Sequence, residues 1–362
     1  MKIAFGYIYG RQERLQNEDY PEEMFYGYHY YLEKYGSVEI IEYGVVKFKI
    51  LKLIERLIIK VTKLPIHLFH MTSLKNLSLI MKLDYLVLTN DRLLFSLLPL
   101  LYIRKLFRRE LNLTVFAMNM FKPEDLNSKN YIKILILRSA YRLVSNFIFL
   151  GEGESKIAKQ FYQSDEKINF IPFYVDESFW VNKFNPKRDG ILFVGNDSNR
   201  EFDKVIELAN YFKDIKFTVV SKHLKISDFT GDNVTFIKGS WGNQKISDSE
   251  LREIYCKSKL VIIPLVESYQ PSGQSVTLQA MALKTPVLIS STKGFWDKEN
   301  FKDSENIFFN FENTLESWKN KINELYSDEK LLSIVGNNSL QTIYKSYTKN
   351  YFEKKLAKII GL

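Results

Sequence analysis

A loop between two apolar segments carries residue types that can bind an anion. In "VIIPLVESYQPSGQSVTLQAMALKTPVLIS" (261–290), an apolar run ends at Pro264 and a helix-like pattern begins near Val276. Between them stand Pro271, Ser272, Gly273, Gln274 and Ser275. The first turn of a helix leaves backbone N–H groups without internal partners, and small residues let a phosphate reach them. The loop predicts a phosphate site or, alternatively, a serine-capped helix that holds only water.

A second loop repeats this design. "ILFVGNDSNREFDKVIELA" (191–209) runs from an apolar strand through Gly195 and a polar turn into an amphipathic helix. Gly195 permits a sharp exit from the strand. Arg200 stands at the start of the helix, where a cation is unfavourable for the helix dipole. An external anion that the guanidinium binds would explain an arginine at this position. The alternative is a surface arginine without a role. Two such loops on one sheet favour a diphosphate as the ligand.

Other common catalytic motifs are absent from the sequence. It has no Walker A lysine motif, no G-x-G-x-x-G after the first apolar run and no G-x-S-x-G turn. No Asp-x-Asp pair is available to hold a metal against a diphosphate. His29, His67, His70 and His223 lack metal-ligand spacing, so we expect core or surface histidines. We therefore expect neither a metal nor a cofactor.

The elements that must position these loops alternate between apolar runs and helix-like stretches. Such alternation predicts parallel sheets in an α/β fold, here two doubly wound Rossmann-like domains in 362 residues. We expect an N-terminal domain over 1–178, a second over 187–340 and a C-terminal helical tail over 341–362. Strands are predicted at 2–8, 85–89, 113–118, 146–151, 190–195, 215–220, 233–239, 259–265 and 285–290. Open parallel sheets bind ligands beyond the carboxyl ends of their strands, where both loops lie.

Cysteine content and hydropathy indicate where the protein acts. Cys256 is the only cysteine, which excludes an intramolecular disulfide and suits a reducing cytosol. The longest apolar run, "LLFSLLPLLYI" (93–103), is too short to cross a bilayer. We expect a cytoplasmic protein, with peripheral attachment to the inner face of the cell membrane as an option.

The net charge of +9 falls entirely within residues 45–110, which hold 13 Lys/Arg and 4 Asp/Glu. In "KFKILKLIERLIIKVTK" (47–63), cations and apolar residues recur at helical spacing. This pattern is typical of an interfacial helix on an anionic membrane, but also of an ordinary helix with a solvated charged face. No recognition motif accompanies the charge, so nucleic acid is not an expected partner. The cations are Lys49, Lys52, Arg56, Lys60 and Lys63, and the apolar positions are Ile50, Leu53, Ile54, Leu57, Ile58 and Val61.

The motifs together resemble those of GT-B glycosyltransferases, nearest to the retaining family 4 enzymes. "FVGNDSNREFDKVIELA" is similar to the family's strand–glycine–basic–helix segment, with Arg200 where the family usually has a phosphate-binding lysine. "CKSKLVIIPLVESYQPSGQSVTLQAMALKTPVLIS" (256–290) resembles its sugar-binding loop and "E-A-M-A" helix, and "FYVDESFW" (173–180) its interdomain link. The resemblance covers most of the chain and is specific in the second domain.

The chain also departs from the family's pattern. Pro271 and Gln279 stand where the family usually has two glutamates, and Asn196 where it often has an arginine. Lys284 and Thr285 replace the glycine that usually precedes the proline of the next strand. These departures are typical of a divergent branch.

The resemblance implies a role for each candidate residue. The donor diphosphate would be bound by Gly195, Asn196, Arg200 and residues 272–275, and the donor ribose or sugar by Gln279 and Pro271. Arg200 would stabilise the leaving diphosphate without a protein nucleophile. In the first domain, Gly6 would line the cleft from the first-strand loop, and Asn119 would act on the acceptor side.

The expected function is transfer of a sugar from a nucleotide diphosphate donor, a UDP-sugar in the first place, to a glycan or lipid-linked acceptor. The expected outcome is retention, and the expected context is bacterial surface-polysaccharide assembly. Two alternatives remain open: a nucleotide-sugar epimerase on the same fold, and a non-catalytic GT-B-like scaffold or partner protein.

Overall fold

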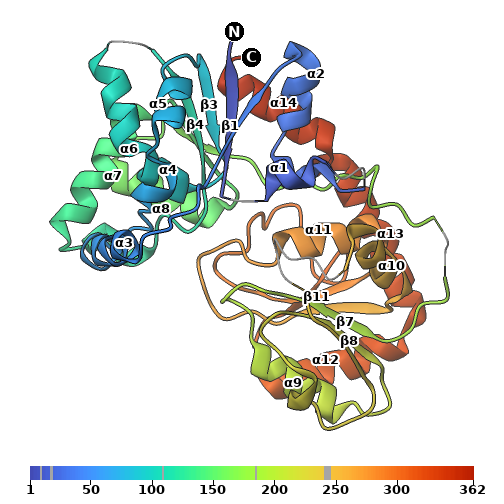
Figure 1. The fold of residues 1–362 in the computed structure, drawn as a ribbon. Helices are drawn as coiled ribbons and strands as arrows, with labels where there is room; N and C mark the ends of the chain where they lie inside the picture. The colour runs from blue at the N-terminus through green and yellow to red at the C-terminus, as the bar shows by residue number, and fades with distance from the viewer. Residues whose placement is uncertain (9, 17–18, 108–109, 184–185, 240–245) are drawn as a thin grey trace. The chain divides into compact units, whose positions relative to one another are not determined.

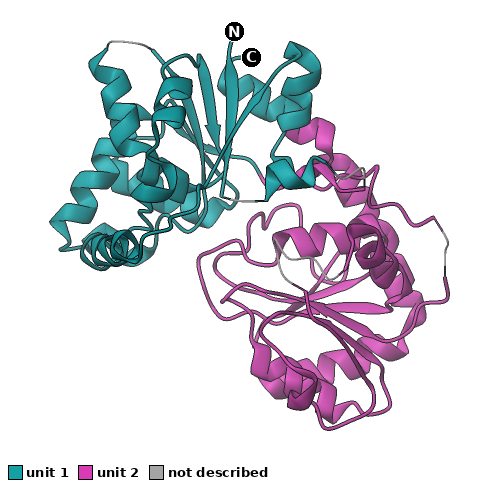
Figure 2. Cartoon of the chain, viewed as in Figure 1, with its two compact units in different colours: residues 1–18, 25–171, 353–362 teal, residues 19–24, 172–352 magenta. Residues whose placement is uncertain are grey.

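The chain forms two compact units, each built around a parallel sheet (Figures 1 and 2). The computed structural model describes residues 1–8, 10–16, 19–107, 110–183, 186–239 and 246–362. Unit 1 comprises 1–18, 25–171 and 353–362, and unit 2 comprises 19–24 and 172–352. The predicted α/β fold with two doubly wound sheets is confirmed.

The described part of unit 1 contains a six-stranded sheet in the order β2-β1-β3-β4-β5-β6, with parallel neighbours throughout. Its strands are β1 (Ile3–Tyr7), β2 (Glu39–Glu42), β3 (Tyr85–Leu88), β4 (Asn112–Ala117), β5 (Asn146–Phe149) and β6 (Ile168–Phe170). Its α-helices are α1 (Arg11–Arg14), α2 (Tyr28–Tyr35), α3 (Lys49–Thr62), α4 (Leu68–Met71), α5 (Leu74–Ile80), α6 (Asp91–Leu106), α7 (Tyr131–Leu143) and α8 (Glu152–Tyr162). Short 3-10 helices cover η1 (Glu22–Phe25) and η2 (Pro123–Asn127).

The described part of unit 2 contains a six-stranded parallel sheet in the order β12-β11-β10-β7-β8-β9. Its strands are β7 (Ile191–Val194), β8 (Phe217–Val220), β9 (Val234–Ile237), β10 (Leu260–Ile263), β11 (Val287–Ser290) and β12 (Phe308–Asn310). Its helices are α9 (Phe202–Tyr211), η3 (Ile226–Asp228), α10 (Asp248–Lys257), α11 (Gln274–Ala282), α12 (Leu315–Ser327) and α13 (Glu329–Ser346). The strand order reverses between β7 and β10, so the loops after these two strands flank the topological switch point, where ligands bind in such folds.

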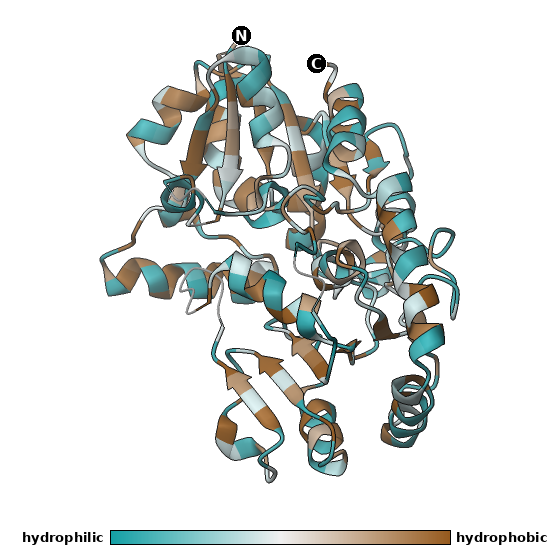
Figure 3. Ribbon diagram, turned by 90° about the vertical axis from the view of Figure 1, so that its right-hand side faces the viewer, coloured by the Kyte–Doolittle hydropathy of each residue, from teal (hydrophilic) through white to brown (hydrophobic). Residues whose placement is uncertain are grey.

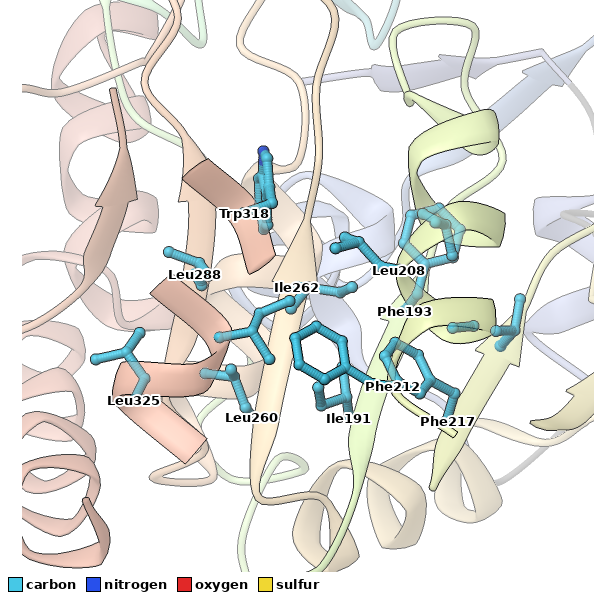
Figure 4. Close-up of a cluster of buried hydrophobic side chains, with 14 of the residues drawn as sticks. Ile191, Phe193, Leu208, Phe212, Phe217, Leu260, Ile262, Leu288, Trp318 and Leu325 are labelled. Atoms are coloured by element: carbon cyan, nitrogen blue, oxygen red, sulfur yellow. The ribbon is translucent and has the colours of Figure 1, made fainter. Parts of the chain in front are cut away.

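The core of unit 2 holds this switch point in place. In Figure 1, α10, α11 and α13 lie on one side of the sheet and α9 and α12 on the other. Phe193 and Ile262, from the two switch-point strands, pack with Leu208 of α9 and Trp318 of α12 in a buried cluster (Figure 4). Strands buried on both faces need apolar residues at successive positions, which the hydropathy colouring of the strands shows (Figure 3).

The borders between the two units differ from the predicted domain borders, which were residues 178, 187 and 341. Unit 2 begins at Pro172, and there Val175 N–H donates to the Tyr347 carbonyl (3.0 Å), which joins the segment before β7 to the end of α13. The last helix, α14 (Lys349–Ile360), passes from unit 2 into unit 1. The predicted helical tail, 341–362, thus comprises the end of α13 and the whole of α14.

Residues 19–24 lie between two segments of unit 1 in the sequence, but they fold with unit 2. Glu22 N–H donates to Asp176 (3.0 Å), and the Tyr174 hydroxyl donates to the Glu22 carbonyl (3.0 Å). These long-range hydrogen bonds fix the segment. No helix within the described residues combines the length and hydropathy needed to cross a bilayer.

Candidate active site

The loops that follow β7 and β10 are joined by hydrogen bonds. Glu201 N–H donates to the Pro264 carbonyl (3.0 Å), and Val266 N–H donates to the Asn199 carbonyl (2.9 Å). The Asn199 side-chain amide donates to Ser272 Oγ (2.7 Å). The two loops predicted to act together thus form one structure at the switch point of unit 2.

Arg200 lies between two glycines that leave room for its side chain. A Cβ at Gly195 would lie 2.7 Å from Arg200 Nε, and a Cβ at Gly273 would lie 3.3 Å from Arg200 Nη1. Gly195 does not have positive φ, so the close approach of Arg200 is what requires glycine at this position. Gly273 does have positive φ, at +82°, which favours glycine for a second reason.

The guanidinium of Arg200 is buried and only partly paired. The residue is 5% exposed, and Nη2 lies 3.3 Å from a carboxylate oxygen of the half-exposed Asp197. Nε and Nη1 have no hydrogen-bond partner among the described residues. Burial lowers the pKa of Arg200, and the Asp197 carboxylate opposes that effect. Because buried donors are nearly always paired, these two atoms indicate a place for an anion.

The N-terminus of α11 adds further donors beside Arg200. Its N-cap is Gly273, which has no side chain to cap the first turn. Ser272 Oγ instead accepts from Asn199, so the alternative of a serine-capped helix is wrong. The N–H groups of the first helical turn and the positive end of the helix dipole attract negative charge. A guanidinium and an uncapped helix together can bind a phosphate group.

A cavity of about 220 Å³ in unit 2 opens at this point. Arg200 and Ser275 line it together with Asp248, a buried carboxylate at the start of α10 that the sequence analysis did not identify. Pro271, Ser272, Gly273 and Gln274 are near in sequence but do not line it. The complete lining is Met24, Val194, Gly195, Asn196, Asp197, Arg200, Val220, Gly239, Ile246, Asp248, Leu251, Ser275, Val276 and Gln279.

Asn196 and Gln279 line the cavity with polar groups that are already engaged. Asn196 Oδ1 accepts from Lys222 N–H (2.6 Å), which ties the loops after β7 and β8. Gln279 Oε1 accepts from the Tyr255 hydroxyl (3.3 Å), and its amide donates to Glu23 (3.1 Å). A ribose at Gln279 would have to share or displace these bonds.

Glu23 is the functional candidate that sequence reasoning missed. Its carboxylate is 1% exposed and accepts from Trp180 Nε1 (2.7 Å), Gln279 Nε2 (3.1 Å) and Asp176 N–H (3.1 Å). Burial raises the pKa of Glu23 to about 7, with Asp176 adding to the effect and the hydrogen bonds opposing it. The sequence contains no local motif for this contact, because residue 23 and residue 279 are distant along the chain.

The two candidates predicted in unit 1 have different outcomes. Gly6 is not in a loop: it is a buried residue of β1, where a Cβ would lie 2.6 Å from Leu88 Cδ2. The prediction for Gly6 is wrong because the strand continues to Tyr7 and packs closely on β3. Asn119 does lie in the loop after β4, exposed and with φ of +67°. Its role stays a prediction.

Buried carboxylates shape the loop that holds Asn119. Glu154 accepts backbone N–H groups from Asn119 (3.2 Å), Met120 (2.6 Å) and Phe121 (3.0 Å). Burial raises the pKa of Glu154 to about 8 and that of Asp91, which accepts from the backbone of the same loop, to about 6. Neither carboxylate was identified from the sequence.

Three residues in unit 1 could in principle hold a cation. Glu55 Oε2 lies 3.6 Å from His70 Nε2 and 3.7 Å from His67 Nδ1. The sequence analysis found no metal-ligand spacing among the histidines, but the start of α4 brings His67 and His70 to one carboxylate of α3. Glu55 also accepts from Phe69 N–H (2.8 Å), so the group fixes α3 to α4.

A larger cavity of about 610 Å³ lies in unit 1, beside Asn112 and Ser145. These residues stand at the amino ends of β4 and β5. Ligands of open α/β sheets bind at the carboxyl ends. The smaller cavity around Arg200 is therefore the candidate active site.

Comparisons with known proteins agree with this fold. Residues 188–328 match the family Glycosyl transferases group 1. The structure is similar to HepE of Anabaena solved with UDP and glucose (13% identity, TM-score 0.68, covering 100% of this chain and 99% of that one). It is also similar to sucrose-phosphate synthase of Thermosynechococcus elongatus (11% identity, TM-score 0.66, 99% and 98% covered) and to a trehalose-6-phosphate synthase (8%, 0.70, 100% and 99%).

Among curated protein sequences, none matches the chain closely enough to indicate a relationship. At these low identities the solved structures establish the fold, and the family match lies on unit 2, the unit that contains the buried Arg200 and the uncapped α11. The chain therefore has the GT-B fold, and its residues 188–328 match the Glycosyl transferases group 1 family.

Proposed function

We propose that this protein is a glycosyltransferase that takes its sugar from a nucleotide diphosphate donor bound in unit 2. The observation that carries the proposal is the buried guanidinium of Arg200, whose Nε and Nη1 have no partner in the described part of the chain and lie beside the N-terminus of α11. A diphosphate supplies oxygen acceptors for both sets of donors and offsets the buried charge.

A UDP-sugar is the proposed donor. HepE of Anabaena, similar in fold, has been solved with UDP, with UDP and glucose, and with UDP-glucose. In this chain, Arg200 and α11 would hold the diphosphate, and Asp248 and Gln279 line the same cavity with a carboxylate and an amide. Those groups can hydrogen-bond to hydroxyls of a ribose or sugar.

The proposed reaction breaks the bond between the anomeric carbon and the diphosphate oxygen. Negative charge develops on that oxygen, and the Arg200 guanidinium with the α11 N–H groups would stabilise it. An acceptor hydroxyl attacks the anomeric carbon from the face that the diphosphate leaves, so the configuration is retained. Its proton passes to the departing diphosphate. No protein nucleophile takes part.

The proposed acceptor is a glycan or a lipid-linked glycan in bacterial surface-polysaccharide assembly. Support comes from the exposed cations of residues 47–63, which suit an anionic setting. Asn119, exposed in a loop of unit 1, is proposed to contact the acceptor.

A thermal-shift panel of UDP-, GDP-, ADP- and CMP-sugars tests the donor directly. A ligand at about 100 times its dissociation constant adds about 2.7 kcal/mol of stability, which is readily measured. We expect the UDP-sugars to stabilise the wild-type protein and to have little effect on Arg200→Ala. Equal stabilisation of both proteins, or none by any donor, would contradict the proposal.

A further inference from the structure

The fully buried residues of α3 are polar, and Leu51 and Ile58 beside them are half-buried. The residues of this helix that are buried are Glu55 and Thr62. Glu55 accepts from Phe69 N–H (2.8 Å) and lies beside His67 and His70, and Thr62 Oγ1 donates to the Ile58 carbonyl (2.7 Å). The helix is therefore held to unit 1 through hydrogen bonds and polar contacts.

The apolar residues of α3 face away from the unit. Figure 1 views the helix along its axis, beside α4. An ordinary amphipathic helix buries its apolar stripe against the core. Here the predicted apolar positions other than the half-buried Ile58 are 40% to 66% exposed, so most of the stripe is not packed as in an ordinary amphipathic helix. The stripe consists of Ile50, Leu53, Ile54, Leu57 and Val61, which share one face of the helix.

The start of α7 extends this surface. The Asn130 side-chain amide donates to the Val61 carbonyl (3.1 Å), which places the two helix ends together. Tyr131 and Leu135, one turn apart on α7, are 82% and 70% exposed. We call Ile50, Leu53, Leu57, Val61, Tyr131 and Leu135 the α3–α7 surface. Large apolar side chains gathered in this way on a surface mark an interaction site.

Cations border the α3–α7 surface. The lone acidic residue of the segment 47–63, Glu55, points inward, as described above. None of the cations has an ion-pair partner among the described residues. They are Lys47, Lys49, Lys52, Arg56, Lys60 and Lys63, all exposed. The surface therefore combines an apolar centre with charge of one sign.

We propose that the α3–α7 surface docks on an anionic lipid bilayer, with its apolar side chains among the acyl chains and its cations at the headgroup phosphates. A bilayer of acidic lipids matches both parts of this surface, because its apolar acyl layer is bordered by negatively charged headgroups. A second copy of this chain would bring like charges together around the apolar centre. Nucleic acid would satisfy the cations and leave the apolar residues in water.

The experiment is flotation of the full-length protein with vesicles, either of phosphatidylcholine alone or of phosphatidylcholine with phosphatidylglycerol. We expect flotation with the acidic vesicles only. Raising the salt should weaken it, because the Debye length falls to about 3 Å near 1 M. Reversal of Lys49, Lys52, Arg56 and Lys60 to Glu should weaken binding more than about 100-fold, since each cation contributes about 5-fold. The matched control reverses the exposed Lys213, Lys298, Lys330 and Lys358, and should float like the wild type.

A second pair of variants separates insertion from charge attraction alone. Leu53→Ser with Leu57→Ser leaves every charge in place and changes only exposed side chains, so the fold should persist. We expect this pair to reduce flotation at least about 10-fold. This is the loss of affinity that corresponds to the transfer free energy of two partly inserted leucine side chains. Ile226→Ser with Ile334→Ser, also exposed, should have no effect. Undiminished flotation of the leucine pair, or equal flotation with neutral vesicles, would overturn the proposal, as would a wild-type dimer that the leucine pair makes monomeric.

Discussion

The side chain of Arg200 occupies the space that a side chain at Gly195 would need: a Cβ there would lie 2.7 Å from Nε and 2.9 Å from Cγ of Arg200. The absence of a side chain directly after β7 therefore determines where the buried cation of Arg200 can lie. The close approach of Arg200 also explains why a glycine without positive φ stands at the end of that strand.

Gly195→Ala should therefore weaken donor binding through Arg200. The added methyl group displaces the guanidinium, and we expect the dissociation constant for UDP to rise about 10-fold, near the value of one charge-assisted hydrogen bond. The double variant with Arg200→Ala is the control: it should bind no more weakly than Arg200→Ala alone, because both changes act on one contact. Additive losses would show that Gly195 acts independently.

Arg200→Ala should lower sugar transfer without unfolding the protein. Loss of one transition-state charge contact typically reduces turnover about 100-fold or more. The melting temperature should stay equal or rise, because the change removes a buried cation, two of whose donors have no partner among the residues that the structure describes. Turnover with a UDP-sugar and thermal unfolding, measured on the same preparation, check both statements. Near-wild-type turnover would remove Arg200 from the mechanism.

Gln279→Glu should destabilise unit 2, although the resembled family has a glutamate at this position. Gln279 donates to the buried carboxylate of Glu23 at 3.1 Å, and a second carboxylate there would repel it. We expect a loss of roughly 2 kcal/mol or more at pH 8 and a smaller loss below pH 6, where one carboxyl can hold a proton. Urea unfolding at both pH values measures it, with Gln279→Met as the uncharged control. Equal stability of the glutamate variant at pH 8 would contradict this arrangement.

Ionisation of Glu23 should reduce stability as the pH rises. Burial raises its pKa from 4.5 to about 7 in the folded protein, so folding favours the protonated form. The stabilisation is fully present below about pH 4.5 and is lost as the pH rises through about 7, amounting to about 3 kcal/mol. Trp180, whose indole N–H donates to Glu23, should report this step in its fluorescence. A difference titration against Trp180→Phe with no transition between pH 5 and 8 would contradict the assignment.

Sugar transfer should survive EDTA. In the proposed site a guanidinium and helix N–H groups neutralise the diphosphate, so a divalent cation has no required position. Activity measured after chelation should equal the untreated rate. Loss of activity that Mg²⁺ or Mn²⁺ restores would show that the diphosphate needs a metal.

Local sequence patterns predicted the central strands of both sheets and the two loops of the site. Each apolar run predicted as a strand overlaps one. All of these strands except β9 lie inside a sheet, where both faces are buried, and the edge strand β9 was predicted from its Val234, Phe236 and Ile237. The strands that were missed, β2, β6 and β12, lie at sheet edges and are three or four residues long. Such strands carry too few buried positions to give a recognisable pattern.

Contacts between distant segments could not be predicted in this way. Arg200 was found because a cation at a helix start contradicts a local rule. Glu23 obeys every local rule, and only the folding of residues 19–24 with unit 2 brings it to Gln279. The inward-facing Glu55 is similar: the helical period of α3 was visible in the sequence, but which face is exposed depends on packing against α4.

Calorimetric titration of UDP tests the central claim most directly, because it requires neither the acceptor nor the sugar. If the diphosphate binds at Arg200 and the α11 N-terminus, wild-type protein should bind UDP and Arg200→Ala should bind it about 10- to 100-fold more weakly. Lys298→Ala, which removes an exposed cation from the same unit, should bind like the wild type. Equal affinity of the wild type and Arg200→Ala for UDP would contradict the account.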